Sequence, residues 1–247
     1  MLVWIILFSL SGTVGVLIAV SAFLLFSEKV QNVLIPCLIS YAVGTLLAAA
    51  LMGLMPHALE DAGTRSVLST VLLGIIVFFL LEKLVLWRHC HDVECEVHAA
   101  AGDMILIGDT IHNSADGVVI AASFLVSVPL GVIAALSVIA HEIPQEVGDF
   151  AILLHSGYTK RRALSLNILS SLSTVVAAVI AYYALEVIEA AVPYVMAVSA
   201  AGFLYIALAD LSPELHSRVD LTYSARQFLL MLAGVATIVL LLQIHVH

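Results

Sequence analysis

The chain has 247 residues, of which 62% are hydrophobic and 11% are charged, and its mean hydropathy is +1.14. Soluble domains carry about 25% charged residues, so this composition excludes an ordinary soluble enzyme and a disordered chain. Nine Lys and Arg against eighteen Asp and Glu also exclude a nucleic-acid binder, which needs a basic surface. The formal net charge of −9 is therefore unusual, because so apolar a chain has little water-facing surface on which acids can lie.

Long apolar segments recur along the whole chain. A membrane-spanning helix needs about 20 mostly apolar residues. The pattern predicts an all-α polytopic membrane protein, with residues 1–247 forming a single transmembrane domain. We expect eight transmembrane helices, at about 2–26, 36–58, 66–87, 103–126, 129–155, 163–188, 193–211 and 226–245.

The basic residues predict an orientation in the membrane. Eight of the nine lie in the connections after the first, third, fifth and seventh spans, and the even-numbered connections hold only Arg65. Cytoplasmic loops carry an excess of Lys and Arg. We therefore expect the odd-numbered connections in the cytoplasm and both termini on the extracytoplasmic side.

Two regions before the fourth span hold metal-ligand residue types. His57 lies at the outer end of span two and is a candidate for the metal path, with an interfacial residue as the alternative. The connection at 88–102 is expected to be a cytoplasmic loop rich in His, Cys and acids, where reduced thiols can bind metal. We interpret it as a metal capture or sensing loop, with a solvated polar loop as the alternative. Its candidate ligands are His89, Cys90, His91, Cys95 and His98.

Spans four and five hold an unusual set of polar side chains. An ionised acid at the centre of a membrane helix costs about 2.5–3.5 kcal/mol, and such residues mark ion paths, proton relays or ligand counter-ions. On each of these spans the polar residues repeat at helical spacing and share a face. The set comprises Asp109, His112, Asn113 and Asp116, followed by His141, Glu142, Gln145, Glu146 and Asp149.

The two spans are joined by about three residues, so they must be antiparallel neighbours whose polar faces meet near mid-membrane. Almost no Lys or Arg lies in them, which leaves a bound cation or protons to neutralise the acids. Imidazole together with carboxylate favours zinc, iron or manganese over sodium or calcium. The pattern predicts a divalent metal site, with a buried polar network that fixes helix register as the structural alternative.

Pro144 lies inside this predicted site. Because proline cannot donate a backbone hydrogen bond, the carbonyl of Ala140 is left free, and a kinked or broken helix is expected there. Broken helices at this depth are typical of transporter binding sites. Further along span five, His155 is a candidate ligand on an exit path.

The two central motifs resemble the paired signatures of the ZIP (ZRT/IRT-like) metal transporters. Those read His-Asn-x-x-Asp-Gly on the fourth helix and His-Glu-x-Pro-x-Glu on the fifth. In this chain the matching segments are His112-Asn113-Ser114-Ala115-Asp116-Gly117 and His141-Glu142-Ile143-Pro144-Gln145-Glu146. The eight spans, the outside termini and the loop after span three also resemble that family, so the resemblance covers the whole chain.

The resemblance implies transport of zinc, or of iron or manganese, into the cytoplasm through a site between helices four and five. By position, the primary ligands implied are His112, Asp116, His141 and Glu142. Asn113 and Glu146 would be neighbouring or path residues, together with Asp109 and Asp149. Many relatives have a second His where this chain has Gln145, whose neutral amide is a poor metal ligand. In this family the motif-bearing helices are thought to move as a block against the others.

The resemblance further implies a protein without a resident cofactor, embedded in the lipid bilayer of the cell (inner) membrane, with an organelle membrane as the alternative. It is compatible with a homodimer. Three other functions stay open. An intramembrane metalloprotease is suggested by His141-Glu142, although Gln145 replaces the second His of the zinc motif. The others are a membrane hydrolase that uses a metal-activated water and an exporter of the same metals.

Overall fold

The computed structural model describes the whole chain except residues 24, 90–96, 217–219 and 245–247. The side chains of residues 28, 85–105, 151, 155, 214 and 244 are also outside the described part. The described residues are almost entirely helical and contain no strand, which confirms the all-α class. The main helices are α1 (Leu2–Phe23), α2 (Glu28–Ala48), α4 (Thr64–His89), α5 (Val97–Val126), α6 (Val128–His155), α7 (Lys160–Val187), α8 (Val192–Tyr205) and α10 (Leu221–Ile244).

Shorter helical segments extend two of these helices. The π-helix η1 (Ala49–Leu54) and α3 (Met55–Asp61) continue α2, and η3 (Ile206–Leu211) and α9 (Ser212–Leu215) continue α8. A single 3₁₀ turn, η2 (Glu189–Ala191), precedes α8. In the described part of the chain, seven helical segments are long and apolar enough to cross a membrane, and α5 is an additional helix of 30 residues.

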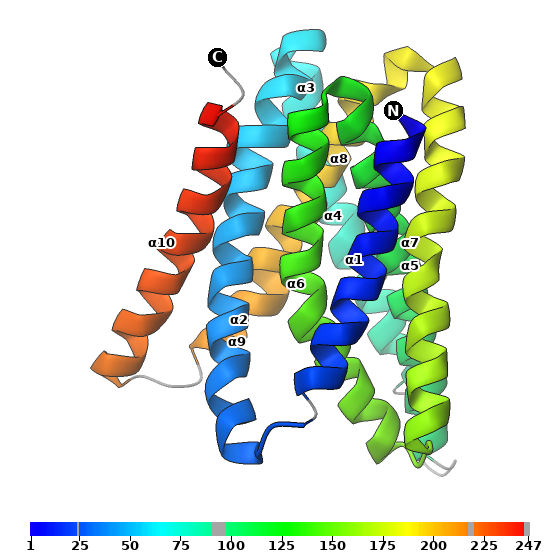
Figure 1. The fold of residues 1–247 in the computed structure, drawn as a ribbon. Coiled ribbons are helices and arrows are strands. Elements are labelled where there is room, and N and C mark those ends of the chain that lie inside the picture. The colour runs from blue at the N-terminus through cyan, green and yellow to red at the C-terminus, as the bar shows by residue number, and fades with distance from the viewer. Residues whose placement is uncertain (24, 90–96, 217–219, 245–247) are drawn as a thin grey trace.

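The helices stand side by side as a bundle (Figure 1). The beginning of α1 and the end of α10 lie at the same end of the bundle. The connections from α1 to α2 and from α6 to α7 lie at the opposite end, which we call the loop end. Large apolar side chains such as Ile18, Leu72 and Val176 are exposed on the outer faces, as a lipid environment requires.

Local sequence signals explain the short connections beside α6. Ser127 is the only residue between α5 and α6, and its hydroxyl caps α6 by accepting a hydrogen bond from the N–H of Leu130 at 3.3 Å. At the other end, Gly157 has a φ of 86°, a left-handed conformation that suits glycine after a helix. Thr159 then caps α7 by accepting from the N–H of Arg162. These two tight turns make α6 antiparallel to both α5 and α7.

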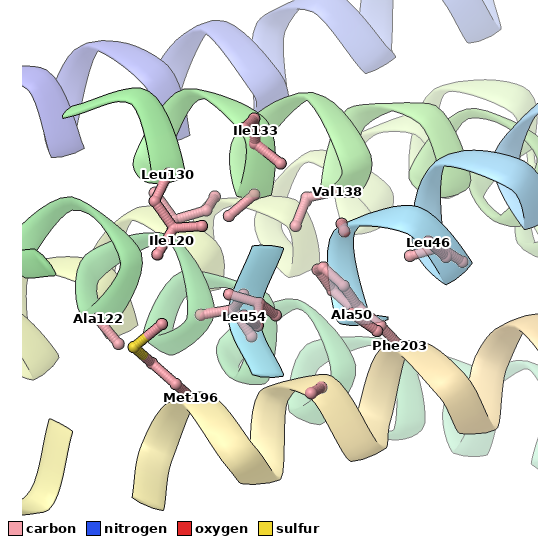
Figure 2. Close-up of a cluster of buried hydrophobic side chains, with 14 of the residues drawn as sticks. Leu46, Ala50, Leu54, Ile120, Ala122, Leu130, Ile133, Val138, Met196 and Phe203 are labelled. Carbon is pink, nitrogen blue, oxygen red and sulfur yellow. The ribbon is translucent and has the colours of Figure 1, made fainter. Parts of the chain in front are cut away.

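The helices pack in two groups. Helices α1, α5, α6 and α7, which we call the site group, all contact one another, and the largest interface is between α5 and α7. α6 also packs on α2, across the boundary between the two groups. Helices α2, α4, α8 and α10 form the flanking group, in which α2 packs on α10 and α4 on α8. The main hydrophobic core lies where the groups meet, with residues such as Leu54 from η1, Ile120 from α5, Ile133 from α6 and Phe203 from α8 (Figure 2).

Of the kink or break expected at Pro144, the break is not present, and the kink stays a prediction. α6 is helical without interruption from Val128 to His155, with Pro144 inside it. A proline removes only one backbone hydrogen bond, and neighbouring helices tolerate this loss in membrane helices. Two departures from α-helical geometry that were not predicted from the sequence are the π-helical segments η1 and η3.

Candidate metal centre

Four metal-ligating side chains meet between α5 and α6. His112 and Asp116 are one turn apart on α5, and His141 and Glu142 are consecutive on α6. One ligand atom from each residue lies within 4.8 Å of all the others. The four primary ligands implied by the sequence resemblance are therefore brought to one point.

The distances within this group suit a bound cation. The Nε2 atom of His141 lies 3.2 Å from Oδ2 of Asp116, and Nε2 of His112 lies 3.3 Å from Oε1 of Glu142. The two Nε2 atoms are 3.2 Å apart. Imidazole nitrogens and carboxylate oxygens are the ligands that zinc uses in proteins. The four donor atoms gather in one small volume, and these residues could hold a metal ion there.

His141 is held in the tautomer that a metal ligand needs. Its Nδ1 donates a hydrogen bond to the carbonyl oxygen of Ser137 at 2.9 Å, so the Nε2 of the neutral ring keeps its lone pair toward the other ligands. The side chain of His141 is fully buried, and the ring of Phe203 from α8 packs edge-on against it at 6.0 Å between centroids. Both contacts fix the orientation of the ring.

One oxygen of each carboxylate in the group faces the two histidines but receives no hydrogen bond. Asp116 and Glu142 are 3% and 5% exposed. Neither Oδ2 of Asp116 nor Oε1 of Glu142 receives a hydrogen bond from the described residues, and their only ion pairs in that part of the chain are with the two histidines. A buried charge without a partner is costly, so a cation at this point would stabilise the arrangement.

The metal centre opens to a cleft between α4, α5 and α8. The cleft has a volume of about 420 Å³, and its walls are mostly apolar, with Phe78, Val198 and Phe203 among them. His112 and Asp116 line it as well, and the side chain of His112 is 20% exposed. The cleft therefore runs along the boundary between the site group and the flanking group.

Asn113 takes a supporting position rather than joining the four ligands. Its Nδ2 donates to Oδ1 of Asp109 at 2.9 Å, and its Oδ1 accepts from the hydroxyl of Thr174 at 2.8 Å. Both amide atoms are therefore engaged with α5 and α7. Gln145 is partly buried on α6, one turn after His141.

The remaining acids of the two helices are buried close to the centre. Glu146 is fully buried and accepts a hydrogen bond from the hydroxyl of Ser171 on α7. Asp109 and Asp149 are 3% and 9% exposed. These three carboxylates are not among the four ligands that converge.

Other candidates from the sequence are not brought to the centre. His57 is partly buried on α3, where its Nδ1 donates to the carbonyl of Gly53 at 2.9 Å, and it is not part of the four-ligand group. His89, His98 and His155 lie in described helices, but their side chains are outside the described part. Cys90, His91 and Cys95 fall outside the described residues altogether.

The sequence analysis missed a polar face on α7. Its residues are buried and contact α5 and α6 through hydrogen bonds, for example from Thr174 to Asn113 and from Ser171 to Glu146. Their positions follow the i, i+3, i+4, i+7 pattern of one helix face, and this spacing within an apolar span is the signal that could have found them. The face comprises Asn167, Ser170, Ser171 and Thr174.

A sequence model of one protein family, the ZIP zinc transporters, matches residues 87–242. The chain belongs to this family. Since the matched segment includes α5, α6 and α7, it contains the whole metal centre. Family membership together with the apolar helices makes the chain an integral multi-pass membrane protein.

Several proteins named as zinc transporters of the ZIP family are similar to this chain. Zinc transporter ZIP13 of Pongo abelii is 34% identical over 218 residues, which cover 82% of this chain and 65% of that protein. The ZIP13 homolog of Drosophila melanogaster is 27% identical, covering 90% of this chain and 81% of that protein. Human zinc transporter ZIP4 is 43% identical over 112 residues, which cover 45% of this chain and 17% of ZIP4. The chain thus spans less than two thirds of ZIP4 and of the Pongo abelii ZIP13.

Proposed function

We propose that this chain carries a divalent transition-metal cation across the membrane, with zinc as the preferred cargo. The cation would pass through the centre formed by His112, Asp116, His141 and Glu142. The observation that carries the proposal is the convergence of these four ligand atoms within 4.8 Å in the interior of a membrane-type bundle. The zinc transport named in the relatives supports the choice of cargo. The cation is the cargo, and no resident cofactor is proposed.

The ligand chemistry favours zinc among the candidates. Two imidazoles and two carboxylates give four ligands of the types that zinc prefers in a tetrahedral arrangement. Iron and manganese accept the same donors, and Gln145 adds no imidazole that would increase the preference for zinc. A competition series with zinc, iron and manganese would rank the three cargoes.

For the direction of transport, we propose uptake into the cytoplasm, with the loop end of the bundle on the cytoplasmic side. The support is the excess of Lys and Arg in the connections at that end, such as Lys160, Arg161 and Arg162. By the same argument both termini are extracytoplasmic, and the membrane that we propose is the cell (inner) membrane. Flux in the opposite direction would make the protein an exporter.

For the mechanism, we propose that the site group moves as one body against the flanking group. Its helices are tied together at the centre by hydrogen bonds: Thr174 donates to Asn113, Ser171 to Glu146, and Thr13 of α1 to the carbonyl of Ser171 at 3.2 Å. The cleft beside His112 lies on the boundary where such a movement would occur. A rigid-body transition moves two internally packed bodies relative to one another at the interface between them.

The test is metal uptake by proteoliposomes. We expect zinc to accumulate with the wild-type chain and the flux to fall to background with His141→Ala or Glu142→Ala, because each change removes a buried ligand. Glu186→Ala is the matched control, since that glutamate is exposed on α7 and should leave the flux unchanged. Flux that survives both site substitutions would refute the assignment, and cleavage of a membrane substrate without flux would favour a metalloprotease or hydrolase.

A further inference from the structure

A small cavity lies on the side of the metal centre that faces α1. Its walls come from α1, α5, α6 and α7, and it shares no lining residue with the cleft beside His112. One of the four proposed ligands, Glu142, lines it directly. The space left for a water molecule is about 10 Å³, which is room for a single molecule. Whatever fills this cavity therefore contacts a metal ligand.

Much of the wall of this cavity is polar. Buried apolar cavities stay dry, whereas buried polar groups bind water, which makes roughly two to four hydrogen bonds to them. The composition of the wall thus favours a bound water molecule. Its polar side chains are those of Ser9, Thr13, Asn113, Glu142, Ser171 and Thr174.

Three hydroxyl groups of the wall already use their hydrogen elsewhere. The hydroxyl of Thr174 donates to Asn113. The hydroxyl of Ser171 donates to Glu146, and that of Thr13 donates to the carbonyl oxygen of Ser171. None of these groups has a hydrogen left for the metal ligand in the wall, although their oxygens can still accept a hydrogen bond.

Ser9 of α1 is the exception among the hydroxyl groups of the wall. Its side chain is 1% exposed, and its oxygen forms no hydrogen bond with any described residue. A buried hydroxyl without a partner costs free energy. Oε1 of Glu142 likewise receives no hydrogen bond from the described residues. A donor without a partner and an acceptor without a donor thus belong to two residues of the same wall, and no direct bond joins them.

We propose that this cavity binds one water molecule, and that Ser9 is a positioning residue that holds the carboxylate of Glu142 through this water. Ser9 donates to the water, and the water donates one hydrogen to Glu142. Its second hydrogen goes to the hydroxyl oxygen of Thr174 or Ser171, since both line the cavity and can accept. The water then makes three hydrogen bonds, which is about the usual number for buried water.

The water gives α1 a part in the metal centre. The four converging ligands come from α5 and α6, but a carboxylate that binds metal also needs an outer partner that fixes its orientation. A water bridge is nearly as favourable as a direct hydrogen bond. Thr13 bonds α1 to α7, and Ser9, one turn earlier, would bond α1 to α6. The effect on zinc binding rests on the proposed function, whereas the presence of the water does not.

Radiolytic footprinting of the purified chain in detergent tests the water directly. Hydroxyl radicals that form from bound water oxidise the side chains beside it. We expect oxidation of Val138, which is buried and lines the cavity, in the wild type, and a loss of this oxidation in Ser9→Ala. Val43 of α2 is the matched control, because it is buried but lines neither the cavity nor the cleft. It should stay unoxidised in both proteins.

Zinc affinity and thermal unfolding of Ser9→Ala test the positioning role. We expect zinc affinity to fall about fivefold, which is less than the roughly 10–100-fold loss for a partner bonded directly to a metal ligand. The melting temperature without zinc should also fall, because the water loses a partner. Ser11→Ala, at an exposed position of the same helix, is the matched control and should change neither quantity.

A hydroxyl that binds no water predicts the opposite result for Ser9→Ala. Removing a buried hydroxyl without a partner should raise the melting temperature and leave zinc affinity unchanged. That result, or equal oxidation of Val138 and Val43 in the wild type, would overturn the proposal. Should Ser9→Ala fail to fold, oxidation of the wild type still decides. A wild type in which Val138 is oxidised but which binds no zinc would refute the proposed function and leave the water site in place.

Discussion

The site group and the flanking group both pack their helices closely, but they differ in the polar contacts between those helices. In the flanking group, Gly44 of α2 lies against the backbone of Met231 on α10, and Gly234 of α10 lies against Tyr41 and Thr45. In the site group, Gly117 of α5 lies against the backbone of Thr174 on α7 in a similar way. Small residues that let backbones approach are a common basis of helix association in membranes.

Polar contacts distinguish the two interfaces. Between α5, α6 and α7 they are buried and involve residues next to the metal centre, such as Asn113 with Thr174 and Glu146 with Ser171. Between α2 and α10 the structure shows a hydrogen bond from Tyr41 to Thr237, which is only partly buried. Close packing thus stabilises both groups, whereas the buried polar contacts that hold the residues next to the ligands lie in the site group. Stability and metal affinity should therefore respond differently to changes in the two groups.

The largest expected effect is on stability, from Gly44→Val in the flanking group. A side chain at position 44 would collide with backbone atoms of Met231, which cannot move aside as a flexible side chain can. We expect the free energy of unfolding to fall by about 3 kcal/mol, the upper range for overpacking. Thermal unfolding in detergent would measure this loss.

Gly15→Val is the matched control for this change. Gly15 lies in α1, and a Cβ added there meets nothing within 4 Å, so the same substitution should be tolerated. The fraction of Gly44→Val that does fold should still bind zinc with wild-type affinity. Equal stability of the two variants would contradict the claim that close packing of α2 on α10 stabilises the flanking group.

The second prediction is a change that lowers zinc affinity more than it lowers stability. Thr174→Val keeps the shape of the side chain but removes the hydrogen bond to Oδ1 of Asn113, which adjoins His112 on α5. Outer partners bonded directly to a metal ligand change affinity by about 10–100-fold when they are lost, and Thr174 acts one step further out, through Asn113, so the low end of this range applies. We expect zinc affinity to fall about tenfold, with a loss of stability of only about 1 kcal/mol. Isothermal titration would measure the affinity.

Thr70→Val serves as the control for Thr174→Val. Thr70 is a partly buried threonine of α4 whose hydroxyl donates to the carbonyl of Ser66, away from the metal centre. It should leave zinc affinity unchanged. If Thr174→Val binds zinc as tightly as the wild type, the polar face of α7 does not position the ligands.

The same contrast explains what could be predicted from the sequence. The all-helical class follows from apolar segments of membrane length, because a helix satisfies its own backbone in lipid. Helical spacing and one short turn predicted that the polar faces of α5 and α6 meet. The resemblance to the ZIP family then singled out His112, Asp116, His141 and Glu142, which the structure brings together. Asn113 shows where prediction from the sequence ends, since an amide at this position can bind a metal or a neighbouring side chain. Only the structure shows that Thr174 donates to Oδ1 of Asn113, so that both polar atoms of the amide are engaged.

Other features could not be predicted because they depend on contacts between helices distant in sequence. The polar face of α7 was visible as a spacing, but its partners are 25 and 61 residues away in the chain. The π-helical segments depend on local backbone hydrogen bonding that hydropathy does not reveal. The break expected at Pro144 is absent because packing around α6 outweighs one lost hydrogen bond.

The smallest expected effect is that of Tyr41→Phe in the flanking group. The change removes the hydroxyl that donates to Thr237 at 3.1 Å, but the hydroxyl of Thr237 keeps its own bond to the carbonyl of Ala233 at 2.9 Å. No buried polar atom of Thr237 is left without a partner, so we expect a loss of only about 0.6 kcal/mol, typical of such bonds between membrane helices. Zinc affinity should not change, because α2 and α10 supply none of the four ligands. A fall in affinity as large as that of Thr174→Val would mean that both groups position the metal, and the distinction between them would fail.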